Sequence, residues 1–358
     1  MKIIVAGGGT AGHVNAGITI LDEFKKRYPG SEDLFIGTRR GIESTLIPQA
    51  GYSIKYINAR GLKRETFFVL LYSLCLIPVS IIQSIMALLK FKPDAVIGVG
   101  GFASGPVLVA ATLLRKPIFL LEQNTVIGLT NRIFVRMAKK IFASFPLDEK
   151  FARYKNKTIM SGNPVRSAIR ASKRVSDPNG FNVFVFGGSQ GSMAINKCVT
   201  AAIPLLNQIK GLAITHQAGK IDFNRTLNEY KKATFEHEVF DYIYDIQTVY
   251  DDTDLVISRA GASTIFELIS VGIPSVLIPL PTAADNHQYF NAKFLSSKGC
   301  AEFIQQGDLT PELLVNRIKY YMNNRNSLEA IKQNIKKFAK AEKRPEQIIV
   351  EVVASYVG

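Results

Sequence analysis

Short apolar runs alternate with amphipathic stretches along the whole chain, and this alternation predicts its architecture. The run at residues 2–6 is continuously apolar after its lysine, which is typical of a parallel strand buried on both faces. A helical pattern follows, with Ile18, Leu21 and Phe24 on one face. Further strands are predicted at residues 33–38, 53–58, 94–99, 116–122 and 140–144, and we expect the last to close the sheet. The first part of the chain is therefore predicted to be an α/β domain with a parallel sheet.

The pattern starts again after a proline-containing stretch at residues 161–166 and a polar stretch at residues 172–180. Strands are predicted at residues 182–186, 212–216, 239–242, 255–258 and 274–279, and the last completes a second parallel sheet. In both halves the first strand leads into a glycine-rich turn and a helix, a layout that suits phosphate binding. We therefore predict two domains of one architecture, residues 1–160 and 161–340. A C-terminal helix within residues 341–358 is predicted to pack back on the first domain.

Residues 66–89 form an uncharged segment of 24 residues. Basic residues flank it on both sides, namely Lys63, Arg64, Lys90 and Lys92. The segment is just long enough to span a bilayer, but Pro78 lies in its middle and a strand pattern resumes at residue 94. A buried helix and a spanning helix are alternatives. A helix that covers the sheet with one face and meets a membrane with the other explains both the apolar character and the basic flanks.

The formal net charge of +15 lies mostly in the first half of the chain. Residues 1–160 hold 22 Lys and Arg against 10 Asp and Glu, whereas residues 161–358 hold 22 against 19. Basic surfaces attract nucleic acid or anionic lipid, and the chain shows no basic–aromatic module for nucleic acid. We therefore expect an anionic membrane surface as a partner and no nucleic acid. Three widely separated cysteines exclude a disulfide framework and favour a reducing compartment, and the start on a strand predicts no cleaved signal peptide.

One strand–helix junction, at residues 255–267, carries the clearest candidate chemistry. Its pattern predicts a strand, a tight turn at residues 259–261 and a helix that opens at residues 262–264. Small residues at that opening leave backbone N–H groups at the positive end of a helix, where a diphosphate fits. Glu267 lies about one helical turn further on, within reach of an attached ribose. The alternative is an ordinary junction of an α/β domain.

His13 is the candidate reacting group. It follows the first glycine-rich turn and opens a helix, where the dipole favours a neutral imidazole over a charged one. A neutral histidine in a cleft can act as a general base. The alternative is a histidine that only caps its own helix.

Six motifs, in this order along the chain, resemble those of the MurG family of GT-B glycosyltransferases. They lie at residues 8–13, 122–124, 162–166, 187–191, 258–264 and 285–288, so the resemblance covers essentially the whole chain. It implies two Rossmann-like parallel-sheet domains that face a central cleft. It also implies inverting transfer of N-acetylglucosamine from UDP-N-acetylglucosamine to the 4-hydroxyl of the muramyl sugar of lipid I, which forms lipid II for peptidoglycan. Such an enzyme would be a peripheral protein on the cytoplasmic face of the bacterial membrane, with cell-wall and division proteins as candidate partners.

The resemblance also assigns site residues. On the donor side, the backbone at Ile243 would meet uracil, Arg166 and Ser189 would hold the nucleotide and diphosphate, and Glu267 would bind the ribose. Gln288, and less directly Asn291, would contact the sugar hydroxyls. The start of the helix that opens at residue 262 would bind the donor through Ala262, Ser263, Thr264, Ile265 and Phe266. The acceptor side would consist of Thr10, Ala11, Gly12 and Asn124, with His13 as the base.

Two departures from the family pattern concern the acceptor side. The family has glycine where this chain has Ala11, whose methyl group would narrow the loop or restrict its φ angle, and Asn15 stands where an apolar residue is usual. No Asp-x-Asp pair is placed to hold a divalent ion, so we expect neither a metal nor a cofactor.

Three other functions fit the same architecture. A glycolipid synthase would share the donor half and differ at the acceptor. A hydrolysing UDP-sugar 2-epimerase would carry acidic catalytic residues and need no membrane surface. A non-enzymatic UDP-sugar-binding protein of the cell-wall machinery would bind UDP without turnover.

Overall fold

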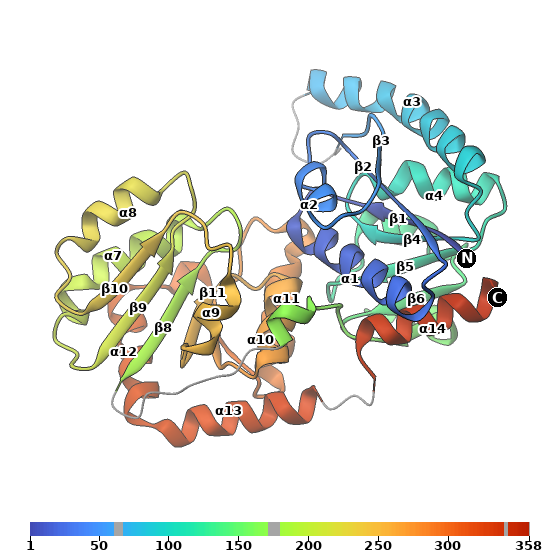
Figure 1. Cartoon of the computed structure of the whole chain (residues 1–358). Coiled ribbons are helices and arrows are strands. Elements are labelled where there is room, and N and C mark those ends of the chain that lie inside the picture. Colours follow the sequence, from blue (N-terminus) through green and yellow to red (C-terminus); the bar gives the residue numbers. More distant parts are fainter. Residues whose placement is uncertain (61–66, 171–179, 340–342, 358) are drawn as a thin grey trace. The chain divides into compact units, whose positions relative to one another are not determined.

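The computed structural model describes residues 1–60, 67–170, 180–339 and 343–357, with residues 67–74 described as backbone only. The chain divides into two compact units (Figure 1). Unit 1 comprises Met1–Arg166 and Glu342–Gly358, and unit 2 comprises Ser167–Ala341. The proline-containing stretch at residues 161–166 thus belongs to unit 1, and the division lies six residues beyond the boundary expected from the sequence.

Unit 1 is built on a seven-stranded parallel sheet in the order β3-β2-β1-β4-β5-β6-β7. Its strands are β1 (Lys2–Gly7), β2 (Glu32–Gly37), β3 (Ile54–Tyr56), β4 (Ala95–Gly100), β5 (Ile118–Glu122), β6 (Lys140–Ala143) and β7 (Thr158–Met160). The prediction that residues 140–144 close the sheet is wrong, because β7 pairs beyond β6. β7 has only three residues and directly follows the charged 3-10 segment η1 (Glu149–Lys157), so it is too short to show a strand pattern.

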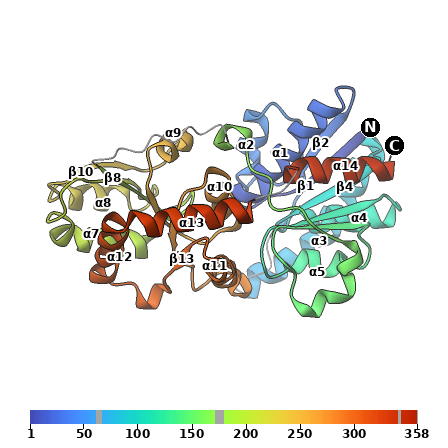
Figure 2. The same ribbon diagram turned by 90° about the horizontal axis from the view of Figure 1, so that it is seen from below.

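Two groups of helices cover the two faces of this sheet. One face carries α1 (Ala11–Arg27), α2 (Glu43–Gln49) and α14 (Pro345–Val357), which share one apolar core with the strands. The other face carries α3 (Phe67–Phe91), α4 (Ser104–Leu113) and α5 (Leu129–Phe134). Figures 1 and 2 both show α14 alongside α1, and an ion pair of 2.7 Å between Arg27 and Glu351 joins the two helices. The C-terminal segment is therefore part of unit 1.

Unit 2 is built on a six-stranded parallel sheet in the order β10-β9-β8-β11-β12-β13. Its strands are β8 (Phe181–Phe186), β9 (Leu212–Gln217), β10 (Glu236–Phe240), β11 (Leu255–Ser258), β12 (Ser275–Leu277) and β13 (Glu302–Phe303). The prediction that the strand at residues 274–279 completes this sheet is wrong, because the two-residue strand β13 pairs outside β12.

The helices of unit 2 also lie on both faces of its sheet. The largest core joins the sheet to α7 (Met193–Leu206), α8 (Phe223–Tyr230), α12 (Pro311–Asn323) and α13 (Arg325–Phe338). The other helices are α6 (Ser167–Arg170), α9 (Ile246–Asp251), α10 (Ala262–Val271) and α11 (His287–Ser297), with short 3-10 turns η2 (Ala284–Asn286) and η3 (Gln306–Asp308). On the face opposite that core, the ring of Phe184 in β8 meets Tyr250 of α9 edge-on at 5.9 Å.

The two sheets share one topological feature that positions candidate sites. In each, the first strand of the unit lies inside the sheet and the strand order reverses beside it, at β1 and β4 in unit 1 and at β8 and β11 in unit 2. Ligands of open α/β sheets bind at the carboxyl ends of strands at such a reversal. Both glycine-rich turns, which follow β1 and β8, lie at this place, and the prediction of two parallel-sheet α/β domains is confirmed.

Candidate active site

The glycine-rich turn after β1 is held by Glu43, a residue that the sequence pattern did not single out. Glu43 is fully buried, and its Oε2 accepts a hydrogen bond of 2.9 Å from the Gly9 N–H. Its Oε1 accepts bonds from the N–H and the hydroxyl of Thr38 at 3.0 and 2.8 Å. A side chain at Gly8, where φ is +153°, would collide with this carboxylate. Glu43 therefore fixes the turn from which α1 starts.

His13 lies in the first turn of α1 and is partly exposed. Its Nδ1 lies 2.9 Å from the hydroxyl of Thr10, the residue that precedes the helix. If Nδ1 donates to that hydroxyl, Nε2 keeps the lone pair that a base requires. On its other side the ring packs against Gly100, where an added Cβ would lie 2.8 Å from Nε2. The local geometry therefore orients the imidazole.

The remaining acceptor-side residues lie near this turn. Gln123 donates to the Gly12 carbonyl at 3.3 Å, which joins the segment after β5 to the first turn of α1. Asn124 follows directly and is partly exposed. Ala11 starts the helix and is absent from the described non-glycine residues with positive φ, so its methyl group causes no backbone strain of the kind that the sequence comparison suggested.

Glu122 ends β5 and is buried beneath the segment that follows this strand. Its carboxylate is only 3% exposed and accepts bonds from the N–H groups of Asn124 and Gly128 and from the Asn131 amide, at 2.9 to 3.0 Å. Burial raises the pKa of Glu122 above its usual range. Glu122 therefore braces the segment that carries Asn124.

In unit 2 the turn before α10 has the properties predicted for a diphosphate site. Gly261 is the N-cap and has no side chain to cap the helix, so the first-turn amides of Ala262, Ser263 and Thr264 have no acceptor within the helix. The Ile265 N–H instead donates to the Gly261 carbonyl at 3.0 Å. The Ile265 amide therefore already has an acceptor within the helix, unlike the three amides before it.

Two buried side chains hold this turn in place. The guanidinium of Arg259 donates to the carbonyls of Ile278 and Pro279 at 3.1 and 3.2 Å, and its burial lowers the pKa to about 10. Asn291 is fully buried and donates to the Ala260 carbonyl at 3.3 Å. The sequence had suggested Asn291 as a sugar contact, but a side chain with no exposed surface supports the turn instead.

Other predicted donor-side groups lie on elements around the same sheet edge. Glu267 is partly exposed on α10, next to the buried Phe266, and accepts a bond of 3.4 Å from the Tyr250 hydroxyl. The Gln288 Oε1 accepts from the Leu280 N–H at 3.0 Å, which leaves its NH₂ group as the part suited to a sugar hydroxyl. Ser189 is exposed in the second glycine-rich turn. The Ile243 N–H donates to the side-chain oxygen of Gln217 at 2.9 Å, so the Ile243 carbonyl is the backbone group suited to uracil.

Arg166 is the last residue of unit 1, whereas the other donor-side residues belong to unit 2. It is partly exposed.

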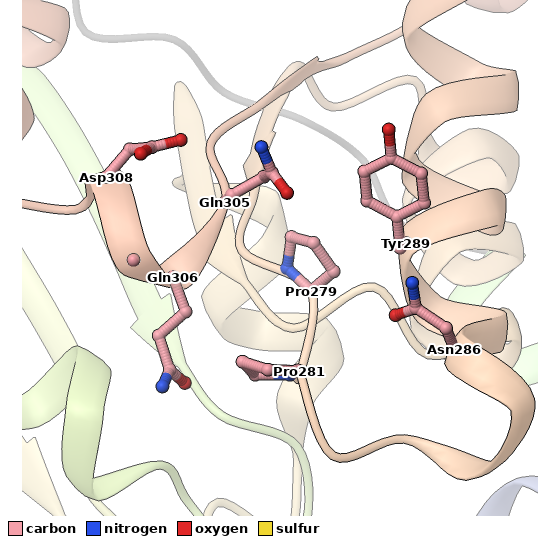
Figure 3. Close-up of a pocket in the computed structure, with 8 residues that line it drawn as sticks. Pro279, Pro281, Asn286, Tyr289, Gln305, Gln306 and Asp308 are labelled. Carbon is pink, nitrogen blue, oxygen red and sulfur yellow. The ribbon is translucent and has the colours of Figure 1, made fainter.

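A pocket of about 260 Å³ lies at the carboxyl ends of β12 and β13 (Figure 3). Asn286 and Tyr289 line one side, and Gln305, Gln306 and Asp308 line the other, with Pro279 and Pro281 between them. Asp285 and Asn286 have left-handed backbone angles, with φ of 52° and 54°. None of the eight lining residues is one that the sequence assigned to the donor.

The side of unit 1 that carries α3, α4 and α5 exposes large apolar side chains. Ile82, Met86 and Leu89 on α3 are 57%, 66% and 56% exposed, and Ile133 on α5 is 57% exposed. Lys63 and Arg64 lie outside the described residues. Within the part of the chain that the structure describes, no helix has both the length and the apolar character needed to cross a bilayer.

Two family models together cover most of the chain. The N-terminal domain of glycosyltransferase family 28 matches residues 3–143, and its C-terminal domain matches residues 182–345. A relative from an Anaeromyxobacter species, named UDP-N-acetylglucosamine–N-acetylmuramyl-(pentapeptide) pyrophosphoryl-undecaprenol N-acetylglucosamine transferase, is 42% identical over 89% of this chain and 84% of its own length. The chain belongs to the MurG family of glycosyltransferase family 28. A Citrifermentans bemidjiense relative with the same name is 39% identical over 99% of both chains.

The comparison with solved structures agrees with this membership. The crystal structure of Acinetobacter baumannii MurG matches with a TM-score of 0.77 and 29% identity over 99% of both chains. The predicted GT-B fold and the predicted MurG resemblance are therefore confirmed.

Proposed function

We propose that this chain is an inverting hexosyltransferase that moves N-acetylglucosamine from its UDP donor to the 4-hydroxyl of the muramyl sugar of lipid I, forming lipid II in peptidoglycan synthesis. The observation that carries the proposal is full-length similarity, at 39% identity over 99% of both chains, to a transferase whose name states this donor and acceptor. The local chemistry of both units supports it.

In unit 1 the reaction needs a base that removes the proton of the acceptor hydroxyl. His13 fits this role because the Thr10 hydroxyl contacts Nδ1 at 2.9 Å, so that Nε2 can receive the proton. The oxygen freed of that proton attacks the anomeric carbon from the side opposite UDP, which inverts the α-linked donor to a β-linked product. Thr10, Ala11, Gly12 and Asn124 would surround the acceptor sugar.

In unit 2 the reaction needs groups that bind the donor and stabilise the negative charge that develops on the leaving UDP. The uncapped first turn of α10 offers backbone donors for this charge, and they need no reorganisation during the reaction. Arg166 and Ser189 would add to these donors. Glu267 would bind the ribose, Ile243 the uracil and Gln288 the sugar.

A radiolabelled-donor assay with purified lipid I tests the proposal. We expect labelled lipid II, and no transfer to diacylglycerol, which a glycolipid synthase would use. His13→Ala should lower kcat about 100- to 10,000-fold, the range of general base catalysis, with little change in UDP affinity. Tight UDP binding without any transfer would support a non-enzymatic binder instead, and an unchanged kcat in His13→Ala would remove His13 as the base.

The proposal includes docking of unit 1 to the cytoplasmic face of the bacterial membrane, where the polyprenyl tail of lipid I resides. Supporting it are the exposed Ile82, Met86 and Ile133 and the exposed basic residues Arg132 and Arg136 beside Ile133. An apolar face with a basic rim suits an anionic interface.

Sedimentation with phosphatidylglycerol vesicles tests this docking. The double variant Ile82→Ser and Met86→Ser should bind the vesicles several-fold less than the parent. Ile221→Ser is the matched control, because Ile221 is 85% exposed on unit 2 and far from this apolar surface in sequence. Equal binding of the double variant and the control would refute the assigned surface. Cell-wall and division proteins stay candidate partners.

A further inference from the structure

Gln217 ends β9, the strand that lies between β8 and β10, and it is only 3% exposed. Its side chain contacts the segments that follow both neighbouring strands. Nε2 donates to the Gly188 carbonyl at 3.0 Å, in the glycine-rich turn after β8. Oε1 accepts from the Ile243 N–H at 2.9 Å, in the segment after β10. One amide group therefore joins the two segments.

The two partners require one donor and one acceptor on the same side chain, and a carboxamide supplies both at any pH. A backbone carbonyl can only accept and a backbone N–H can only donate, so the orientation of the Gln217 amide follows from its partners. An ionised glutamate could accept from Ile243 but would set a second oxygen against the Gly188 carbonyl. Methionine, of similar length, would make neither bond.

The bond to Gly188 determines where the next amide points. In a planar trans peptide the C=O and the following N–H point in opposite directions, and no described peptide bond is cis. Because the Gly188 carbonyl points to Gln217, the Ser189 N–H points away from β9. Gly188 has φ of +88°, and nothing lies within 4 Å of an ideal Cβ there. Its carbonyl is held by Gln217 and by the Gly191 N–H at 3.0 Å.

A buried network holds the end of β9 itself in place. The Asn196 amide donates to the Ala218 carbonyl at 2.8 Å, and the Asn196 Oδ1 lies 3.0 Å from Nε2 of the fully buried His216. Gly191 and Gly219 leave no room for side chains between the turn and the end of β9. Gln217 thus extends from a fixed backbone, and its reach sets the separation of the two segments.

We propose that Gln217 is a positioning residue for the nucleotide: it aims the Ser189 amide at the diphosphate and holds the Ile243 segment at the distance that the uracil requires. This inference rests on the proposed function, because it assumes a UDP donor. Gln217 itself would touch neither the phosphates nor the reacting atoms.

Calorimetry with uridine, UMP and UDP on Gln217→Met tests the inference. Gln217→Met removes two buried hydrogen bonds and no longer fixes the direction of the Ser189 N–H. UDP binding should therefore weaken about 10- to 100-fold. The gain in affinity from uridine to UDP should shrink, because the misdirected Ser189 amide affects only phosphate binding. The donor KM should rise with the same factor, while the acceptor KM stays unchanged.

The control is Gln208→Met, the same substitution at an exposed residue of unit 2, which should leave all these values unchanged. Unchanged affinities in folded Gln217→Met, or a lower melting temperature with an unchanged gain from uridine to UDP, would overturn the inference. If Gln217→Met does not fold, Gln217→Glu keeps the bond to Ile243 and must still lose phosphate-dependent affinity more than uridine affinity. Failure of the parent protein to bind UDP would instead refute the proposed function.

Discussion

Replacing Glu43 with glutamine should destabilise unit 1 and disturb its catalytic turn. The substitution conserves volume, so it creates no cavity beside Gly8 and changes only hydrogen bonding. The Glu43 carboxylate accepts bonds from the Gly9 N–H at 2.9 Å and from both donors of Thr38 at 2.8 and 3.0 Å. A glutamine has one oxygen, so if that oxygen stays with Thr38, its NH₂ group faces the Gly9 N–H and two donors oppose each other.

The expected cost follows from the full burial of this site. A hydrogen bond to a charged group contributes about 1.5–3 kcal/mol, and a buried donor left without an acceptor costs about 1–3 kcal/mol. These two terms overlap for the Gly9 bond, so we expect a loss of about 2–4 kcal/mol in the free energy of unfolding of unit 1. A typical domain has a stability of about 5–15 kcal/mol, so the variant should still fold.

Denaturant unfolding monitored on both units, together with transfer kinetics, measures this effect. Glu149→Gln is the matched control, because it removes the same charge from an exposed residue of unit 1. We expect a lower unfolding midpoint and a lower kcat in Glu43→Gln only, with UDP affinity unchanged because every proposed donor residue except Arg166 lies in unit 2. If the two variants had equal stability within about 0.5 kcal/mol, the assigned role of Glu43 would be wrong.

Three further predictions concern single residues. Thr10→Val should lower kcat about 10- to 100-fold without changing stability, because it removes the hydroxyl that orients His13; equal rates in a transfer assay would contradict this. Glu267→Ala should weaken UDP binding about tenfold in calorimetry while leaving melting unchanged, and an unchanged affinity would exclude a ribose contact. Burial lowers the pKa of His216 from 6.5 to about 3, so on acidification the unfolded chain takes up this proton first. Between pH 6.5 and about 3 the parent should therefore lose about 1.4 kcal/mol of stability per pH unit relative to His216→Gln, and equal pH profiles in denaturant titrations would refute a buried neutral imidazole.

The fold was predictable from the sequence where both faces of a strand are buried. Continuous apolar runs located β1, β4 and β8 to within a residue or two, because burial on both faces leaves no polar positions. The strands β7 and β13 were missed because three and two residues carry no periodic signal. Their pairing depends on the neighbouring strand already in place, which is tertiary information.

The candidate site was predictable to the level of segments. The local pattern predicted that His13 and Glu267 lie on helices and Ser189 in a glycine-rich turn, and the structure has them in these elements. The supporting groups could not be found in this way. Glu43 and Gln217 contact glycines that are 34 and 29 residues away, and neither contact leaves a periodic trace in the sequence. Only the sheet order brings these side chains to the turns.

These two supports lead us to expect that two turns of similar sequence suit different ligands. Glycine-rich turns have few side chains to fix them, so a buried polar group from a neighbouring element must offset their conformational entropy. Glu43 can only accept, so it draws the Gly9 N–H inward, away from any ligand. Gln217 donates to the Gly188 carbonyl and thereby turns the Ser189 N–H outward. The first turn commits one of its amides to the protein. We therefore expect this turn to suit a neutral sugar hydroxyl and the second turn to suit a phosphate. We therefore expect that substitutions at Glu43 and Gln217, which exchange an acceptor for a donor, change the charge of the ligand that each turn accepts. Substitutions of the glycines should not have this effect.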